Sequence, residues 1–329
     1  MKVEATSLKR TFELYREEYE AAALRSLRSG WYVMGRELME FEEQFAAYHG
    51  AKHCVGLNSG QDALLLAIRA LGIGPGDEVI VPSNTYIATV LGVTENGATP
   101  VFVEPDEYFN MDASRIEAAI TDKTKAILPV HLYGQACDME AIAAIAQRHG
   151  LQLLEDCAQS HGARYAGRLT GTFGICGCFS FYPTKPLGAL GDAGAIITND
   201  DEFAEKMRML RNYGSRVKYV NETVGINSRL DEVQAAVLKV GLCHLEEGNA
   251  LRAEIAQRYH SGIVNPKVRL PRVLPGAGHV YHQYPLLCKE RDALQAYLLD
   301  RGVKTIIHYP IPPHLAPCYA PLGYHKGDF

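Results

Sequence analysis

Short apolar segments alternate with longer amphipathic segments along most of the chain, and this alternation restricts the fold more than any other feature. The apolar segments lie at 53–57, 78–82, 99–103, 125–130, 151–155, 178–182 and 194–198. Several are separated by segments of helical pattern, roughly ten to fifteen residues long, and such an alternation indicates βαβ units. We therefore predict an α/β fold with a mostly parallel mixed sheet flanked by helices.

The helical pattern also precedes and follows this region. Helices are expected at about 9–29, 37–48, 62–71, 84–95, 112–120, 138–149, 200–212 and 229–260. After about residue 262 prolines cluster, and strand-like segments at 281–288 and 304–309 surround a helix at 290–301. We predict a large domain over 1–245 with an N-terminal helical arm, and a small α+β domain over 246–329.

Composition excludes several classes of protein. The net charge is −5, and no block of like charges indicates a nucleic-acid or membrane-surface partner. No apolar run approaches the roughly 20 residues that span a bilayer, and the polar N-terminus lacks the apolar stretch of a signal peptide. We expect a cytoplasmic protein that binds neither nucleic acid nor membrane.

Metal and nucleotide motifs are also missing from the sequence. The eight cysteines form no C-x-x-C pair, and no H-E-x-x-H spacing occurs, so we expect no metal site and buried, inert thiols. The sequence contains no phosphate-binding G-x-x-x-x-G-K-[ST] loop, no G-x-G-x-x-G fingerprint and no G-x-S-x-G elbow.

One lysine and one aspartate are the strongest candidates for chemistry. Asp156 follows the apolar run 151–155, and Lys185 lies in the segment CFSFYPTKPLGALGDAGA. A lysine amine can bond covalently to an aldehyde, and an aspartate can keep a pyridine nitrogen protonated, which are the two protein groups that pyridoxal phosphate requires. Taken singly, Asp156 could cap a turn and Lys185 could be a solvated surface lysine.

A second candidate feature is an anion site at a helix start. Ser59, Gly60 and Gln61 follow the run 53–57 and open a helix, whose free N–H groups and dipole favour a phosphate. Ser180 could add a hydroxyl from a neighbouring strand. An ordinary helix cap is the simpler interpretation of the turn alone.

The segment 210–238 is rich in basic and aromatic residues. Such a loop could hold a diphosphate, although a solvated surface loop has the same composition. Its basic and aromatic residues are Arg211, Tyr213, Arg216, Lys218, Tyr219 and Arg229.

Seven motifs in order connect these candidates to a known family. They are NSGQDAL, GPGDEVIVPSNTYIAT, VHLYGQACDM, EDCAQSHGA, CFSFYPTK, GDAGAIITN and NSRLDEVQAA. This set resembles the DegT-type sugar-nucleotide aminotransferases over nearly the whole chain. The resemblance implies the fold-type I aminotransferase architecture, pyridoxal 5'-phosphate as cofactor and a homodimer whose active sites are shared between subunits.

The resemblance also implies roles for individual residues. Lys185 would bind the cofactor covalently, Asp156 would face the ring nitrogen and Gln159 would lie near the ring hydroxyl. Tyr86 would stack on the ring. The phosphate would be surrounded by Ser59, Gly60, Gln61 and Ser180, and by Asn227 from the partner subunit.

The substrate expected from the resemblance is a nucleotide-linked keto sugar. Tyr182 in SFYPTK and the segment NYGSRVKY resemble the subgroup that aminates carbon 3 of a dTDP-3-keto-6-deoxyhexose, with L-glutamate as amino donor. The candidate substrate contacts are Tyr182, Lys218, Tyr219, Arg229, His308 and Tyr309. Amination at carbon 4 and a regulatory protein without turnover remain alternatives, whereas the related dehydratases carry histidine in place of Lys185.

The sequence departs from the family pattern at three places. Pro186 follows the lysine where asparagine is common, and Gln61 replaces a frequent threonine. Relatives continue into a further helix beyond GYHKGDF at 323–329, so we expect a shortened small domain.

Overall fold

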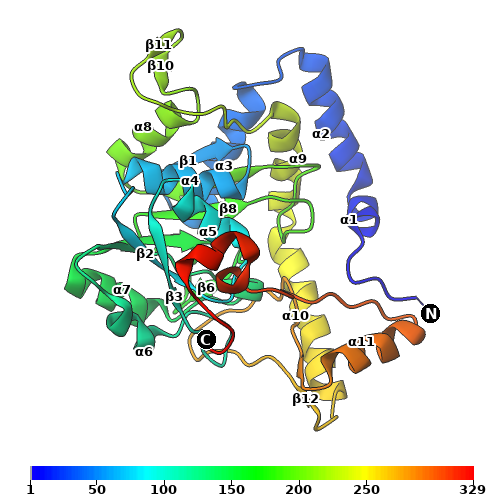
Figure 1. Ribbon diagram of the computed structural model, residues 1–329. Helices are drawn as coiled ribbons and strands as arrows, with labels where there is room; N and C mark the ends of the chain where they lie inside the picture. Colours follow the sequence, from blue (N-terminus) through cyan, green and yellow to red (C-terminus); the bar gives the residue numbers. More distant parts are fainter. Residues whose placement is uncertain (1) are drawn as a thin grey trace.

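A seven-stranded sheet forms the centre of the computed structural model, which describes residues 2–329 (Figure 1). The order across the sheet is β1-β9-β8-β5-β4-β2-β3. β9 runs antiparallel to both of its neighbours, and the remaining pairs are parallel. The bounds are β1 His53–Leu57, β2 Glu78–Pro82, β3 Thr99–Val103, β4 Thr124–Ile127, β5 Gln152–Asp156, β8 Cys176–Ser180 and β9 Gly194–Thr198. The predicted mostly parallel mixed sheet is confirmed.

Helices follow the predicted pattern, with two interruptions. Their bounds are α1 Leu8–Leu14, α2 Arg16–Ser29, α3 Arg36–His49, α4 Gly60–Ala70, α5 Ile87–Thr94, α6 Ala113–Ile116, α7 Met139–His149, α8 Asp201–Leu210, α9 Glu232–Cys243, α10 Leu245–Gly262 and α11 Arg291–Asp300. The first expected helix breaks at Tyr15, and the helix expected at 229–260 breaks at His244, because neither residue keeps helical backbone angles. α10 still extends α9 along one side of the molecule (Figure 1).

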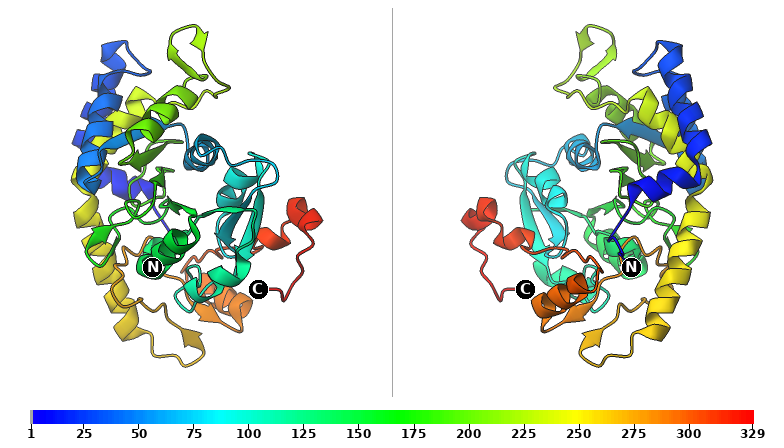
Figure 2. Two further views of the ribbon diagram at one scale, coloured as in Figure 1. Left: turned by 90° about the vertical axis from the view of Figure 1, so that its left-hand side faces the viewer. Right: turned by 90° about the vertical axis from the view of Figure 1, so that its right-hand side faces the viewer.

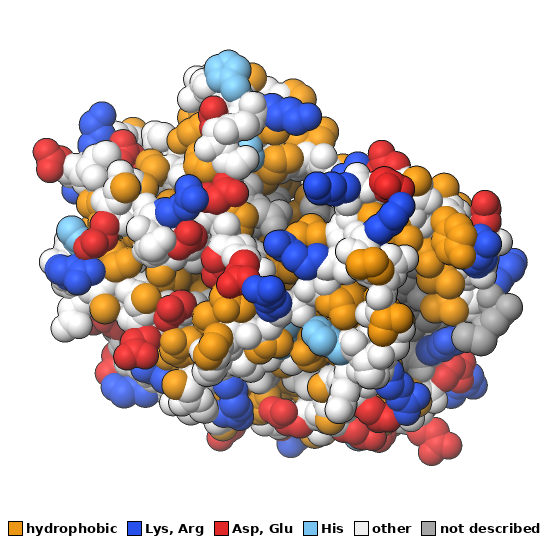
Figure 3. Space-filling view, turned by 90° about the horizontal axis from the view of Figure 1, so that it is seen from below, with side chains coloured by type: hydrophobic (Ala, Val, Ile, Leu, Met, Phe, Trp, Pro, Cys, Tyr) orange, Lys and Arg blue, Asp and Glu red, His pale blue; other side chains and the backbone are white. Residues whose placement is uncertain are grey.

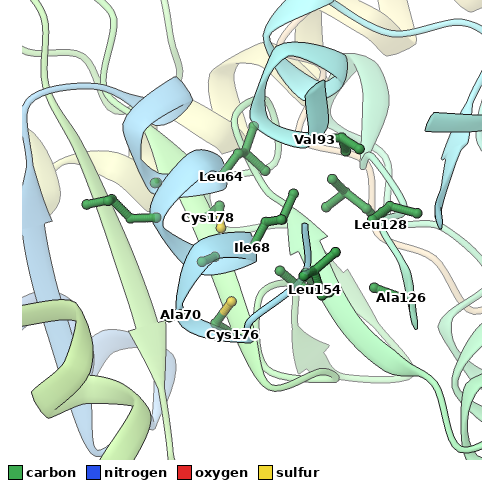
Figure 4. Packing of buried hydrophobic residues seen from close by; sticks show 14 of the residues in the cluster. Leu64, Ile68, Ala70, Val93, Ala126, Leu128, Leu154, Cys176 and Cys178 are labelled. Atoms are coloured by element: carbon green, nitrogen blue, oxygen red, sulfur yellow. The ribbon is translucent and has the colours of Figure 1, made fainter. Parts of the chain in front are cut away.

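Both faces of the sheet are buried, which explains why its strands are mostly apolar. On one face, Leu64 and Ile68 of α4 pack against Leu154 of β5 and Cys178 of β8 (Figure 4). On the other face, α3 places Phe41 and Phe45 against Phe179 and Phe181, with edge-to-face ring contacts of 5.0–5.4 Å. A third cluster packs α6 and α7 against β2, β4 and β5.

The C-terminal part contains less sheet than expected. Two-residue strands β12 (Val268–Arg269) and β13 (Leu287–Cys288) pair with one another, and within the described chain residues 304–309 form no strand. The prediction of a strand at 304–309 is wrong because a strand requires a partner along its length. Here only an isolated bridge between Val3 and Val303 adjoins the segment, and the side chain of Ile306 is 61% exposed.

The last residues return to the large sheet. η3 (Pro313–Leu315) and η4 (Pro317–Leu322) lie near β3, where Tyr319 joins the main core and Tyr324 meets Phe102 edge to face at 5.2 Å (Figure 1). The division of the chain at residue 245 coincides with the start of α10 and stays a prediction.

Short hairpins and 3-10 turns complete the fold. The hairpin of β10 (Ser215–Val217) and β11 (Val220–Asn221) projects from the body of the molecule (Figure 2). The other elements are β6 Arg164–Tyr165, β7 Arg168–Leu169, η1 Glu117–Ala119 and η2 Leu132–Gly134. Within residues 2–329, no helix combines the length and apolar character that crossing a bilayer requires.

Candidate active site

The candidate residues gather at the carboxyl edge of the sheet, where parallel strands present their ends to a ligand. Asp156 is the last residue of β5 and pairs with Cys178 of β8. Across the next three strands, Ser180, Gly194 and Leu57 lie in one row. The loops that follow Leu57, Asp156 and Ser180 are therefore brought together at this edge of the sheet.

Asp156 is buried and held by its own chain. The carboxylate accepts hydrogen bonds from the backbone N–H of Ala158 at 3.1 Å and from the hydroxyl of Thr89 at 2.8 Å. Burial raises the pKa of Asp156, while these two donors and the nearby Lys185 act in the opposite direction. A protonated pyridine nitrogen placed beside Asp156 would favour the charged form of the carboxylate.

Lys185 lies in a turn directly after β8. Its backbone N–H donates to the carbonyl of Tyr182 at 2.8 Å, which closes the turn. Burial lowers the pKa of the Lys185 amine, and the charge of Asp156 offsets part of this effect. A lowered pKa makes more of the neutral amine available, and the neutral amine is the form that attacks an aldehyde.

The phosphate turn packs closely on the neighbouring strands. Ser59 caps α4 by accepting the N–H of Asp62 at 3.1 Å. A Cβ atom at Gly60 would lie 2.5 Å from Cβ of Ser180, so only glycine fits there. The side chain of Gln61 instead donates to Glu95 at 2.9 Å, so Gln61 offers this site its backbone N–H.

Aromatic residues form one wall of the site. Tyr86 is exposed at the start of α5, and its ring lies 5.7 Å from that of Tyr309. The hydroxyl of Tyr309 accepts a hydrogen bond from the amide of Gln159 at 2.9 Å. Next to it, His308 contacts Gln283 at 3.1 Å. The structure thus brings His308 and Tyr309 to Gln159, more than 140 residues away in the chain.

Of the remaining candidates, Lys218 and Tyr219 lie apart from this group within one subunit, whereas Asn227 and Arg229 flank Ser228, which contacts Asn58 and Asp62. Lys218 and Tyr219 form the tip of the projecting hairpin, where Tyr219 is 87% exposed and the Lys218 amine lies 5.1 Å from its ring. Asn227 is exposed and Arg229 donates to Asn212 at 3.3 Å, beside the ring of Tyr213. Tyr182 is exposed beside the lysine turn.

Thr89 and Tyr133 are site residues that the sequence reasoning missed. Thr89 lies one helical turn after Tyr86, and this spacing was the available signal. Tyr133 contacts Gln159 and the backbone of His308. Nothing in the sequence around Tyr133 indicates these contacts.

A buried acid below the site has a structural role. Glu155 lies within 4.8 Å of His131 and Cys157, in an arrangement that could suit a metal ion. Its carboxylate already accepts hydrogen bonds from His131 and from the N–H groups of Gly171, Phe173 and Gly174. These contacts shape the loop before β8 and occupy the oxygens that a metal would need.

The fold and the site together define a fold-type I aminotransferase. Residues 14–329 match the model of the DegT/DnrJ/EryC1/StrS aminotransferase family, and the chain belongs to this family. Its members use pyridoxal phosphate.

Three known proteins illustrate the similarity. The chain is 53% identical over 315 residues to dTDP-3-amino-3,4,6-trideoxy-alpha-D-glucose transaminase of Streptomyces venezuelae, which covers 95% of this chain and 83% of the relative. It is 54% identical over 307 residues to dTDP-3-amino-3,6-dideoxy-alpha-D-galactopyranose transaminase of Aneurinibacillus thermoaerophilus, with 93% and 85% covered. The crystal structure of S. venezuelae DesV in complex with a ketimine intermediate superposes with a TM-score of 0.97 at 52% identity, and covers 99% of this chain and 89% of DesV.

The side chains present suit pyridoxal phosphate. Lys185 offers a half-buried amine of lowered pKa, and Asp156 offers a buried carboxylate at the appropriate strand end. Gly60 packs on Ser180 at the start of α4, where the first N–H groups of the helix suit a phosphate. When bound, the cofactor supplies an aldehyde that takes up an amino group and a ring that withdraws charge from the substrate carbon.

Proposed function

We propose that this aminotransferase transfers the amino group of L-glutamate to carbon 3 of a dTDP-3-keto-6-deoxyhexose. The observation that carries the proposal is the placement of Asp156 and Lys185 at the ends of two paired strands, in a chain more than half identical to two dTDP-3-amino-sugar transaminases. The product would be a dTDP-linked 3-amino-6-deoxyhexose of the kind used in surface glycans or antibiotics.

Each residue of the site has a task in this proposal. Asp156, oriented by Thr89 and Ala158, holds the proton on the ring nitrogen. The Lys185 amine first binds the cofactor and, once released, moves a proton from the α-carbon of glutamate. On the return half of the cycle, Lys185 delivers a proton to the sugar carbon that receives the amine.

The cofactor is held at both ends in this scheme. The N–H groups of Gly60 and Gln61 and the hydroxyls of Ser59 and Ser180 bind the phosphate at the positive end of the α4 dipole. Gln159 donates to the ring hydroxyl, and Tyr86 covers one face of the ring. Tyr182, His308 and Tyr309 line the side that the sugar enters.

A homodimer supplies the remaining contacts in the proposal. Asn227 would reach the phosphate of the partner subunit, and Lys218, Tyr219 and Arg229 would contact the diphosphate of its substrate. Two features support this arrangement: the projecting hairpin, and an exposed apolar surface within residues 24–39. That surface contains Leu24, Leu27, Trp31, Tyr32, Met34 and Met39. Exposed apolar patches of this kind mark interaction surfaces.

The test uses matched keto sugars and labelled donor. Purified protein is incubated with 15N-glutamate and either a dTDP-3-keto or a dTDP-4-keto 6-deoxyhexose, and the products are analysed by mass spectrometry. We expect the label in the 3-amino sugar, and none with Lys185→Ala. Label in the 4-amino sugar alone would replace the proposal by the carbon-4 alternative, and label in neither sugar would reject both.

A further inference from the structure

Tyr133 is the centre of a hydrogen-bonded ring that no assigned role explains. Its backbone N–H donates to Oε1 of Gln159 at 2.7 Å, and its hydroxyl donates to the carbonyl of His308 at 2.7 Å. Nε2 of Gln159 donates to the hydroxyl of Tyr309 at 2.9 Å. Because His308 and Tyr309 are consecutive, these contacts close a ring through three segments of the chain.

The ring determines which way the amide of Gln159 faces. A backbone N–H can only donate, so the atom that it contacts is the amide oxygen. The NH2 group of Gln159 therefore points the other way, with one hydrogen directed to Tyr309 and the second still available. This second hydrogen is the one that the ring hydroxyl of the cofactor would accept.

The same contacts orient Tyr309. Its oxygen accepts from Gln159, so its own hydrogen is free to donate elsewhere. Burial raises the pKa of Tyr309, and the phenol remains protonated at neutral pH. Its ring lies 5.7 Å from that of Tyr86, on the side of the site proposed for the sugar.

Tyr133 is itself held in an unusual conformation. Its φ of +58° lies in the left-handed region, which L-residues rarely adopt. Its carbonyl accepts the N–H of Gln283 at 3.1 Å, so all three polar groups of Tyr133 contact different segments. Strained residues of this kind cluster at functional sites.

We propose that Tyr133 is a positioning residue that aims the phenol of Tyr309 at the keto-sugar substrate. The Tyr133 hydroxyl fixes segment 308–309 over the cofactor, and its N–H fixes Gln159. Tyr309 then donates to an oxygen of the sugar. This inference rests on the proposed function of the site.

Tyr133→Phe removes the contacts of the phenol with His308 and Asn84 and keeps the N–H contact with Gln159. We expect KM for the keto sugar to rise about fivefold to tenfold, as the loss of one buried hydrogen bond predicts. The rate of the glutamate half-reaction should stay within about twofold, since Gln159 and Lys185 keep their contacts. Tyr319→Phe, which removes a buried phenol bonded to Thr94 at 2.9 Å, is the matched control and should change neither value.

A second measurement uses the protein without cofactor or substrate. In hydrogen exchange, we expect amides within 305–311 of Tyr133→Phe to exchange about fivefold faster than in the unsubstituted protein, with little change in the central sheet. Should Tyr133→Phe fold poorly, Tyr133→Met also lacks the hydroxyl donor, keeps the backbone N–H contact with Gln159 and gives the same comparison.

A double-mutant cycle decides whether Tyr133 acts through Tyr309. If it does, Tyr133→Phe combined with Tyr309→Phe is no worse toward the keto sugar than Tyr309→Phe alone. Fully additive effects, or unchanged KM and exchange in Tyr133→Phe, overturn the inference. Turnover of the keto sugar by the unsubstituted protein tests the proposed function, whereas the double-mutant cycle tests the role of Tyr133. Failure of the inference about Tyr133 therefore leaves the proposed function standing.

Discussion

At the scale of single residues, Thr89 orients the carboxylate of Asp156 through a hydrogen bond. The carboxylate is buried, and a buried carboxylate is stable in its charged form only when donors compensate its lost hydration. Thr89, in α5, supplies one of the two donors to this carboxylate. Thr85 contacts the Thr89 hydroxyl at 2.7 Å. The orientation of the Asp156 carboxylate therefore depends on a neutral side chain.

Replacement of Thr89 by valine tests this dependence. Thr89→Val keeps the shape and removes a hydrogen bond to a charged group, a loss of about 1.5–3 kcal/mol, so kcat should fall about tenfold to a hundredfold. Stopped-flow measurement of the glutamate half-reaction provides the value. Thr85→Val leaves the Thr89–Asp156 contact in place and should keep most of the rate; an equal loss in both variants would contradict a specific role for Thr89.

At the scale of elements, the strands were predictable and their supporting contacts were not. Segments 53–57 and 194–198 are mostly apolar because both faces of the sheet are covered, and this signal is local in sequence. The strand predicted at 304–309 was wrong because it depends on a contact that is not local in sequence. β-Branched residues favour a strand only where a partner strand exists.

In the candidate site too, some residues could be predicted from the sequence and others could not. Lys185 and Asp156 could be found from the sequence because their chemistry is specific to residue type. Tyr133 could not, because its role depends on a left-handed backbone and on His308, which is remote in the chain. The side-chain contact of Gln61 with Glu95 was unexpected for a similar reason, since it links two helices.

Close packing of the phosphate turn gives a prediction at this scale. Gly60→Ala places a methyl group 2.5 Å from Ser180, so the start of α4 must shift away from β8. We expect calorimetry to show pyridoxal phosphate binding at least about tenfold weaker, with a loss of stability of about 1–3 kcal/mol from overpacking. Gly262→Ala, where a Cβ would meet nothing within 4 Å, is the control and should bind the cofactor normally.

At the scale of the whole molecule, surface features indicate where a second subunit would bind. The hairpin of β10 and β11 extends away from the body (Figure 2). The exposed apolar side chains of residues 24–39 lie on the N-terminal arm. In contrast, the face seen in Figure 3 carries acidic and basic side chains interspersed with apolar ones. An electrostatic field of a single sign therefore does not guide the association of subunits through that face.

Subunit mixing tests whether the sites are shared. Lys185→Ala lacks the essential amine, and Asn227→Asp would place a negative charge against the phosphate of the partner. Each variant should be nearly inactive alone. Refolded together, half of the dimers combine both variants and hold one intact site, so roughly a quarter of the unsubstituted activity should return. A mixture as inactive as its components would show that Asn227 serves its own subunit.

Buried histidines predict how stability depends on pH. Burial lowers the pKa of His49 to about 4 and that of His279 to about 3, against about 6.5 in the unfolded chain. Between these values only the unfolded chain takes up the protons, so stability falls as pH decreases from about 6.5 to about 4. Asp106, whose pKa burial raises to about 6, acts in the opposite direction.

Urea unfolding at two pH values measures the histidine contribution. We expect His49 alone to lower the free energy of unfolding by ~2 kcal/mol between pH 7 and pH 5. The variant His49→Gln should lose less stability over the same interval, because it cannot titrate. An identical decrease in both proteins would assign the acid sensitivity to other groups.

The position of β1 has a consequence for synthesis in the cell. Among the strands of the central sheet, β1 pairs with β9, which ends at Thr198. While the ribosome is still translating the stretch between them, the turn at Ser59–Gly60 lacks the strand that holds it beside Ser180. We therefore expect a nascent chain to capture its vitamin B6 coenzyme only after β9 has left the exit tunnel, however early the first helices form.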